Sequence, residues 1–131
     1  MTARILNIES RRRKNRIGIV CPTDFHFSEG DTIDAQAVIE SPNISLYCLD
    51  HECQRALFVE TPADVDLSQT PFYYQAQYEN TVGLFAVPYE ELHRLANDIR
   101  IDSKCLILIY SVGRSGSTLL SSALNQVENI V

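Results

Sequence analysis

Residues 105–120 of the chain read CLILIYSVGRSGSTLL, and this stretch decides the expected fold. Its first six residues are apolar or β-forming, which predicts a buried strand. A turn rich in glycine and serine follows, and it leads into the stretch 119–127, where apolar side chains recur at helical spacing. The sequence therefore predicts a strand, a turn and a helix in direct succession.

Such a turn concentrates groups that bind anions. Backbone N–H groups, the positive end of the helix dipole and the hydroxyls of Ser117 and Thr118 would all face one place. We therefore expect a phosphate-type anion site here. The alternative interpretation is an ordinary helix cap, in which Ser115 or Ser117 accepts a hydrogen bond from the first turn.

The turn differs from a Walker A loop at two decisive positions. That loop requires a glycine where this chain has Ser111 and a lysine where it has Ser117. Since the lysine bridges the β- and γ-phosphates in nucleoside triphosphatases, its replacement argues against ATP or GTP hydrolysis. The positive charge lies instead at Arg114, two residues before Gly116.

An arginine followed by Ser-Gly-Ser-Thr after an apolar run resembles the loop of the sulfotransferase family, which usually reads Pro-Arg-Ser-Gly-Thr-Thr-Leu or Pro-Lys-Ser-Gly-Thr-Thr-Trp. Gly113 stands where the family often has proline. The resemblance implies that the loop holds the 5′-phosphosulfate of PAPS (3′-phosphoadenylyl sulfate), the co-substrate, without a metal. The residues implied in this binding are Gly113, Arg114, Ser115, Gly116, Ser117 and Thr118.

The resemblance also implies an activity, namely transfer of a sulfuryl group from PAPS to a hydroxyl or amine of an acceptor. Arg114 would be the catalytic residue, because it would neutralise charge on the oxygen that bridges to the leaving phosphate. In this family the 3′-phosphate site and the general base follow later in the chain. We therefore expect an incomplete, N-terminal part of a longer enzyme that is inactive alone. The alternatives are a divergent P-loop nucleotide kinase or NTPase and a non-catalytic α/β binding module.

The rest of the chain is expected to form an α/β fold. Strands are predicted at 17–20, 44–49, 55–60 and 81–87, a loop at 28–31, and helices over 70–80 and from residue 88 onward. The alternation of strands and helices predicts a parallel sheet covered by helices. We expect an N-terminal arm and loop region over 1–40, and an α/β region over 41–131 that contains the start of the P-loop-like domain.

Composition and charge restrict the function classes. A chain of 131 residues with 45% hydrophobic residues is long enough for one domain. Its net charge is -6, and residues 1–16 carry six of the 11 Lys and Arg, so the remainder is strongly acidic. An acidic body disfavours nucleic-acid binding, and we expect the basic run at 11–16 to be a solvated surface. No apolar run is long enough to span a membrane, and the expected location is cytoplasmic.

Three other groups of residues are candidate sites. Cys48, His51 and Cys53 provide only three zinc ligands where a structural site needs four, so a polar hairpin turn is the expected structure there. His93 is expected at the surface of a helix. The aromatic residues at 72–74 and 78 either fill a core or stack against a ligand, and we expect the core.

Overall fold

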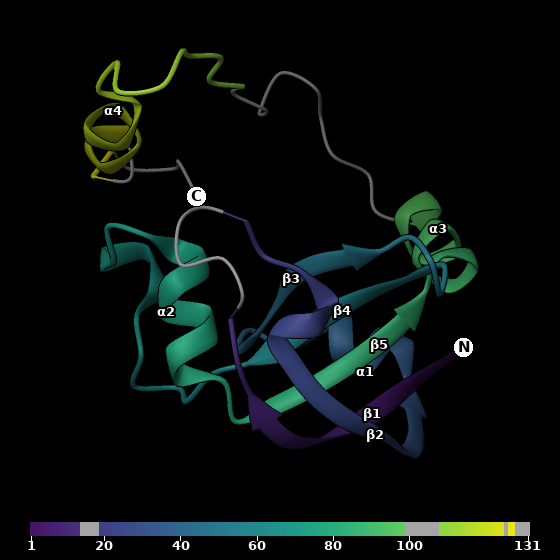
Figure 1. The fold of residues 1–131 in the computed structure, drawn as a ribbon. Helices are drawn as coiled ribbons and strands as arrows, with labels where there is room; N and C mark the ends of the chain where they lie inside the picture. Colours follow the sequence, from purple (N-terminus) through teal and green to yellow (C-terminus); the bar gives the residue numbers. More distant parts are fainter. Residues whose placement is uncertain (14–18, 99–107, 125, 128–131) are drawn as a thin grey trace.

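The computed structural model describes residues 1–13, 19–98, 108–124 and 126–127, and its centre is one five-stranded sheet (Figure 1). Every neighbouring pair of strands is antiparallel, in the order β2-β1-β5-β4-β3. The strands are β1 (Thr2–Arg11), β2 (Phe25–Asp34), β3 (Ile44–Asp50), β4 (Arg55–Glu60) and β5 (Gly83–Pro88).

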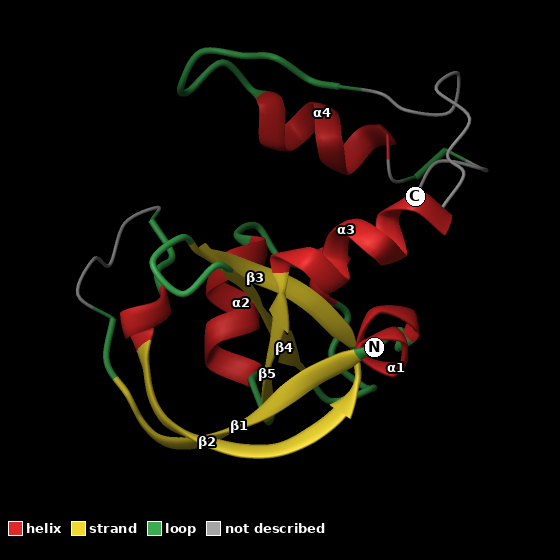
Figure 2. Cartoon of the chain, turned by 90° about the vertical axis from the view of Figure 1, so that its right-hand side faces the viewer, coloured by secondary structure: helices red, strands yellow, loops and turns green. Residues whose placement is uncertain are grey.

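Short helices connect the strands and cover both faces of the sheet (Figure 2). The α-helices are α1 (Ala35–Glu40), α2 (Tyr73–Asn80), α3 (Tyr89–Asp98) and α4 (Ser117–Leu124), and the 3-10 helices are η1 (Pro22–Asp24) and η2 (Leu67–Gln69). Helices α1 and α3 pack on one face of the sheet, while α2 and η1 lie on the other.

Two hydrophobic cores form because successive side chains of a strand point to opposite faces. In β4, Ala56 and Phe58 enter the core under α1 and α3, whereas Leu57 and Val59 enter the core under α2. Strand β5 alternates in the same way. Strands β4 and β5 are therefore buried on both faces, and together they form the centre of the fold.

The predicted parallel sheet is wrong, since the sheet is antiparallel throughout. The alternation of strands and helices along the chain suggested a parallel sheet with helices on both faces. Strands β4 and β5 are covered on both faces, but helices from different parts of the chain supply that cover. Strand β1 then inserts beside β5, which local sequence patterns do not reveal.

Three elements were not predicted from the sequence, namely β1, β2 and α1. Because β1 and β2 belong to the sheet, the sheet takes strands from both sides of residue 40. The predicted loop at 28–31 is wrong, because these residues lie within β2, an edge strand whose side chains are mostly exposed. Exposed edge strands need few apolar residues, so their pattern is weak. Of the strand predicted at 17–20, residues 17 and 18 lie outside the described part, and Ile19 and Val20 are in neither a strand nor a helix.

Other predicted elements are confirmed. The β3–β4 hairpin pairs Asp50 with Arg55 across a short turn, as the polar residues around Asp50 predicted. Helix α2 ends at the predicted residue but begins later, because Thr70 closes η2 and Phe72 precedes the first turn of α2. On α3, Leu95 is buried and His93 is exposed, as its spacing predicted.

The basic residues near the N-terminus do not all form a solvated surface. Arg11 donates to the carbonyl oxygens of Tyr78, at 3.2 Å, and Thr81, and thereby binds the C-terminal end of α2. The Arg13 guanidinium lies 5.2 Å from the Tyr74 ring centre and 5.5 Å from that of Tyr78. These two arginines therefore hold α2 against β1. Arg11 is nevertheless exposed, as predicted, whereas Arg13 is half-buried and the prediction of a solvated run is wrong for it.

Candidate functional site

The loop before α4 places a left-handed glycine directly before the helix. Gly116 has a φ of 86°, which residues with a side chain rarely adopt, and α4 begins at the next residue. The first helical bond runs from the Leu120 N–H to the Gly116 carbonyl oxygen at 3.1 Å. The N–H groups of Ser117, Thr118 and Leu119 therefore have no acceptor inside the helix.

A second left-handed residue, Arg114, precedes the glycine with a φ of 61°. Between the two, the Ser115 hydroxyl donates to the Val112 carbonyl oxygen at 2.7 Å, so it stabilises the turn. A Cβ added at Gly113 or Gly116 would have no heavy atom within 4 Å. The need for glycine at 116 thus comes from its φ angle.

The buried strand predicted before this loop is wrong over 108–110, while residues 105–107 lie outside the described part. Leu108 and Tyr110 are in no strand and are 83% and 101% exposed. Apolar β-forming residues become a buried strand only when a neighbouring strand and a covering layer are present. Within the described residues, the sheet pairs with no strand from this segment.

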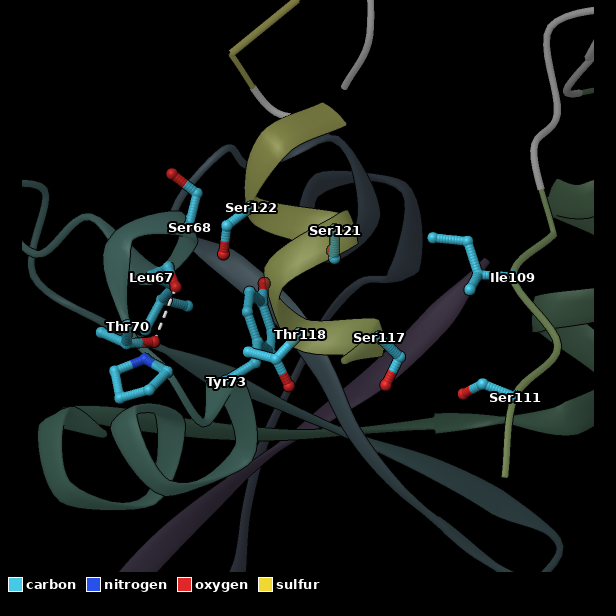
Figure 3. Close-up of a pocket in the computed structure, with 11 residues that line it drawn as sticks. Leu67, Ser68, Thr70, Tyr73, Ile109, Ser111, Ser117, Thr118, Ser121 and Ser122 are labelled. Atoms are coloured by element: carbon cyan, nitrogen blue, oxygen red, sulfur yellow. Dashed lines mark hydrogen bonds between the residues drawn. The ribbon is translucent and has the colours of Figure 1, made fainter. Parts of the chain in front are cut away.

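A cavity of about 810 Å³ lies between the loop segment, residues 108–124, and the sheet body, residues 1–98 (Figure 3). One wall comes from α4 and the residues before its loop, and the other comes from η2 and the start of α2. Ser117 and Thr118, two of the predicted site residues, line it, whereas Gly113, Arg114, Ser115 and Gly116 do not. The lining residues are Leu67, Ser68, Thr70, Pro71, Tyr73, Ile109, Ser111, Ser117, Thr118, Ser121 and Ser122.

Sequence analysis missed the wall formed by residues 67–73, which we call the 67–73 wall. Phe72 and Tyr73 were expected to fill a core, but they are 58% and 47% exposed, so that prediction is wrong for both. Tyr78 does pack against the core beneath α2, as expected. One sequence signal could have indicated this exposure. These aromatic residues lie at the start of a helix with little amphipathic character, and such a helix has no apolar face that must be buried.

The cysteine and histidine group lies away from this cavity, in and beside the β3–β4 hairpin. Cys48 is buried, and burial together with the Asp24 carboxylate raises the pKa of its thiol to about 12, while Cys53 is exposed. His51 Nδ1 lies 3.1 Å from the Tyr89 hydroxyl. Over the described residues, no three His, Cys, Asp or Glu side chains are grouped as a metal site would require.

Comparisons with known proteins found no matching family model, no matching curated protein and no matching solved structure. In the described part of the chain, every helix is too short or too polar to cross a membrane. Functional inference therefore depends on the residues and geometry described above.

Proposed function

We propose that residues 113–118 bind the 5′-phosphosulfate group of PAPS, and that the protein acts in sulfuryl transfer to a hydroxyl or amine acceptor. The observation that carries this proposal is the left-handed Gly116 directly before the first turn of α4. This arrangement leaves three backbone N–H groups at the positive end of the helix dipole. Anions bind such positions in many unrelated proteins.

Two kinds of side chain would add to the backbone contribution. The Ser117 and Thr118 hydroxyls lie in the first turn of α4 and line the adjacent cavity. Arg114 is exposed, and its guanidinium can make two parallel hydrogen bonds to phosphate or sulfate oxygens. Such charge-assisted bonds typically contribute about 1.5 to 3 kcal/mol each.

In the proposed reaction the bond between sulfur and the oxygen bridging to the 5′-phosphate breaks, and a new bond forms between sulfur and the acceptor oxygen or nitrogen. The acceptor loses its proton, and adenosine 3′,5′-bisphosphate leaves. Arg114 would stabilise the negative charge that develops on the bridging oxygen. Among the described residues that line the cavity, none is His, Asp or Glu, so the proton passes to water or to a base outside this lining.

Titration calorimetry of the 131-residue chain with adenosine 3′,5′-bisphosphate tests the proposal. We expect binding that a metal chelator does not weaken and that is tighter than binding of ATP with Mg²⁺. Arg114→Ala should weaken it about tenfold or more, because a charge-assisted contact is lost. Arg12→Ala is the matched control, since it removes an equal charge from an exposed residue of the sheet body.

The other outcomes identify the alternatives. Magnesium-dependent ATP binding that is at least as tight would contradict the proposal and favour a divergent P-loop kinase or NTPase. If neither nucleotide binds, the loop is a helix cap in a non-catalytic module. Equal losses of bisphosphate affinity in the Arg114 and Arg12 variants would show that binding depends on the net charge of the chain and not on Arg114 itself.

A further inference from the structure

We propose that the 67–73 wall binds the acceptor, and that this acceptor is an uncharged, hydroxyl-bearing ring compound such as a sugar. The inference rests on the proposed function, because it assigns the wall opposite α4 to the second substrate. It also means that the acceptor is selected by the sheet body, residues 1–98, and not by the loop segment, residues 108–124. The cavity of about 810 Å³ has a suitable size for a small molecule next to the loop.

The serine and threonine hydroxyls of the 67–73 wall have already donated their protons. Ser68 Oγ donates to Asp66 Oδ1 at 2.6 Å, and Thr70 Oγ1 donates to the Leu67 carbonyl oxygen at 2.7 Å. A hydroxyl has one proton but two lone pairs, so these oxygens can offer only lone pairs to a ligand. The wall therefore favours a ligand that donates hydrogen bonds, as a sugar hydroxyl does.

The α4 wall has the opposite character. The N–H groups of Ser117, Thr118 and Leu119 have no acceptor within the helix, and they lie at its positive end. Figure 3 shows the hydroxyls of α4 and the side chains of the 67–73 wall around the same hollow. The α4 wall thus suits an anion, and the 67–73 wall suits a neutral molecule that donates hydrogen bonds. The proposed sulfuryl transfer needs one such place for each of its two substrates.

Charge near the 67–73 wall also selects against a second anion. A neighbouring cavity of about 250 Å³ shares Leu67, Ser68 and Tyr73 with the first, and Asp66 is among its lining residues. Hydrogen bonds from the Ser68 hydroxyl and N–H lower the pKa of Asp66, so its carboxylate is ionised at neutral pH. A ligand carrying its own carboxylate is therefore repelled from this side.

Tyr73 provides the apolar part of the wall. Its side chain is about half exposed and lines both cavities, so one face of a ring compound can lie against it. The chain contains no tryptophan, so Tyr73→Trp would place a single fluorescent reporter in the wall. Phe72→Trp is the matched control, because Phe72 is adjacent and exposed but does not line the cavity.

The experiment titrates the Tyr73→Trp chain with phenyl β-D-glucoside and with phenyl β-D-glucuronide, which has a carboxylate in place of the C6 hydroxymethyl group. We expect a saturable fluorescence change with the glucoside, about threefold weaker binding of the glucuronide, and no saturable change in the Phe72→Trp chain. Equal or tighter binding of the glucuronide would overturn the inference. So would the lack of any response in the Tyr73→Trp chain, or an equal response from the control.

A second variant tests the role of charge without removing the turn. Asp66→Ser keeps a side chain that can accept the Ser68 N–H bond at the start of η2, but it removes the carboxylate. We expect its affinity for the glucuronide to approach that for the glucoside. An unchanged preference would show that Asp66 does not select the ligand, and the charge part of the inference would be wrong.

Failure of this inference can be distinguished from failure of the proposed function. Arg114→Ala, introduced into the Tyr73→Trp chain, should weaken adenosine 3′,5′-bisphosphate binding and leave the fluorescence response to the glucoside unchanged. If the bisphosphate binds and the glucoside does not, only the inference fails. If the glucoside binds and the bisphosphate does not, the wall is a sugar site but the loop is not a site for PAPS.

Discussion

Apolar side chains are buried in the centre of the sheet body, residues 1–98, but exposed in the loop segment, residues 108–124. In the body, apolar side chains are buried on both faces of β4 and β5. In the loop segment Leu108, Val112 and Leu119 are each at least 75% exposed, although the segment is just as apolar in character. Apolar sequence therefore produces burial only where the tertiary structure supplies a second layer.

The two regions also divide the proposed chemistry. The loop segment carries the backbone conformation and the arginine that suit an anion. The body carries the 67–73 wall, against which we propose that the acceptor binds. Loops that bind ligands are commonly placed against a stable scaffold in this way.

The largest effect is expected from the core of the body. Leu57 is fully buried in β4, so Leu57→Ala should destabilise the fold by about 3 kcal/mol through lost apolar contact and a residual cavity. Denaturant unfolding measures this. Leu119→Ala, on exposed α4, is the control and should change the unfolding free energy by less than about 0.5 kcal/mol. Similar losses in both variants would mean that α4 packs against the body in solution.

A smaller and pH-dependent effect is expected at Asp50, at the end of β3. Burial alone would raise its pKa, but hydrogen bonds from Arg55 Nε at 3.0 Å and from the Cys53 N–H at 3.1 Å outweigh burial and lower it. Asp50→Asn should cost about 2 kcal/mol at pH 7, because Arg55 loses one carboxylate partner and keeps Glu29, at 2.7 Å.

The sign of the pH effect follows from the lowered pKa. The stabilisation by Asp50 is fully present above its unfolded pKa of about 4, and it is lost as the pH falls through the lower folded pKa. The stability difference between the natural chain and Asp50→Asn should therefore shrink in acid. Unfolding curves measured from pH 7 down to the acid limit of folding check this, and a constant difference would contradict it.

The smallest effect on global stability is expected at Gly116, where the effect on binding should be large. Gly116→Ala must place a side chain at a φ of 86°, which costs about 1 kcal/mol locally. Since the loop segment is exposed, the unfolding midpoint of the body should hardly move, while binding of adenosine 3′,5′-bisphosphate should be lost. Unaltered binding in Gly116→Ala would leave the loop without an anion site.

Sequence analysis predicted part of the candidate site and part of the fold. The loop residues 113–118 were predicted from a local pattern, and the helix after them follows from that same pattern. The 67–73 wall could not be predicted, because its position opposite α4 depends on how distant parts of the chain meet. Whether the loop residues bind PAPS stays a prediction.

Local elements whose signals are complete within a few residues could be predicted from the sequence. These are the β3–β4 hairpin, the end of α2, the buried face of α3 and the turn before α4. Only the tertiary structure decided the antiparallel direction of the sheet, the insertion of β1 beside β5 and the exposure of residues 108–110. The physical reason is that strand direction, strand neighbours and burial depend on pairing between residues far apart in the chain, which no local pattern encodes.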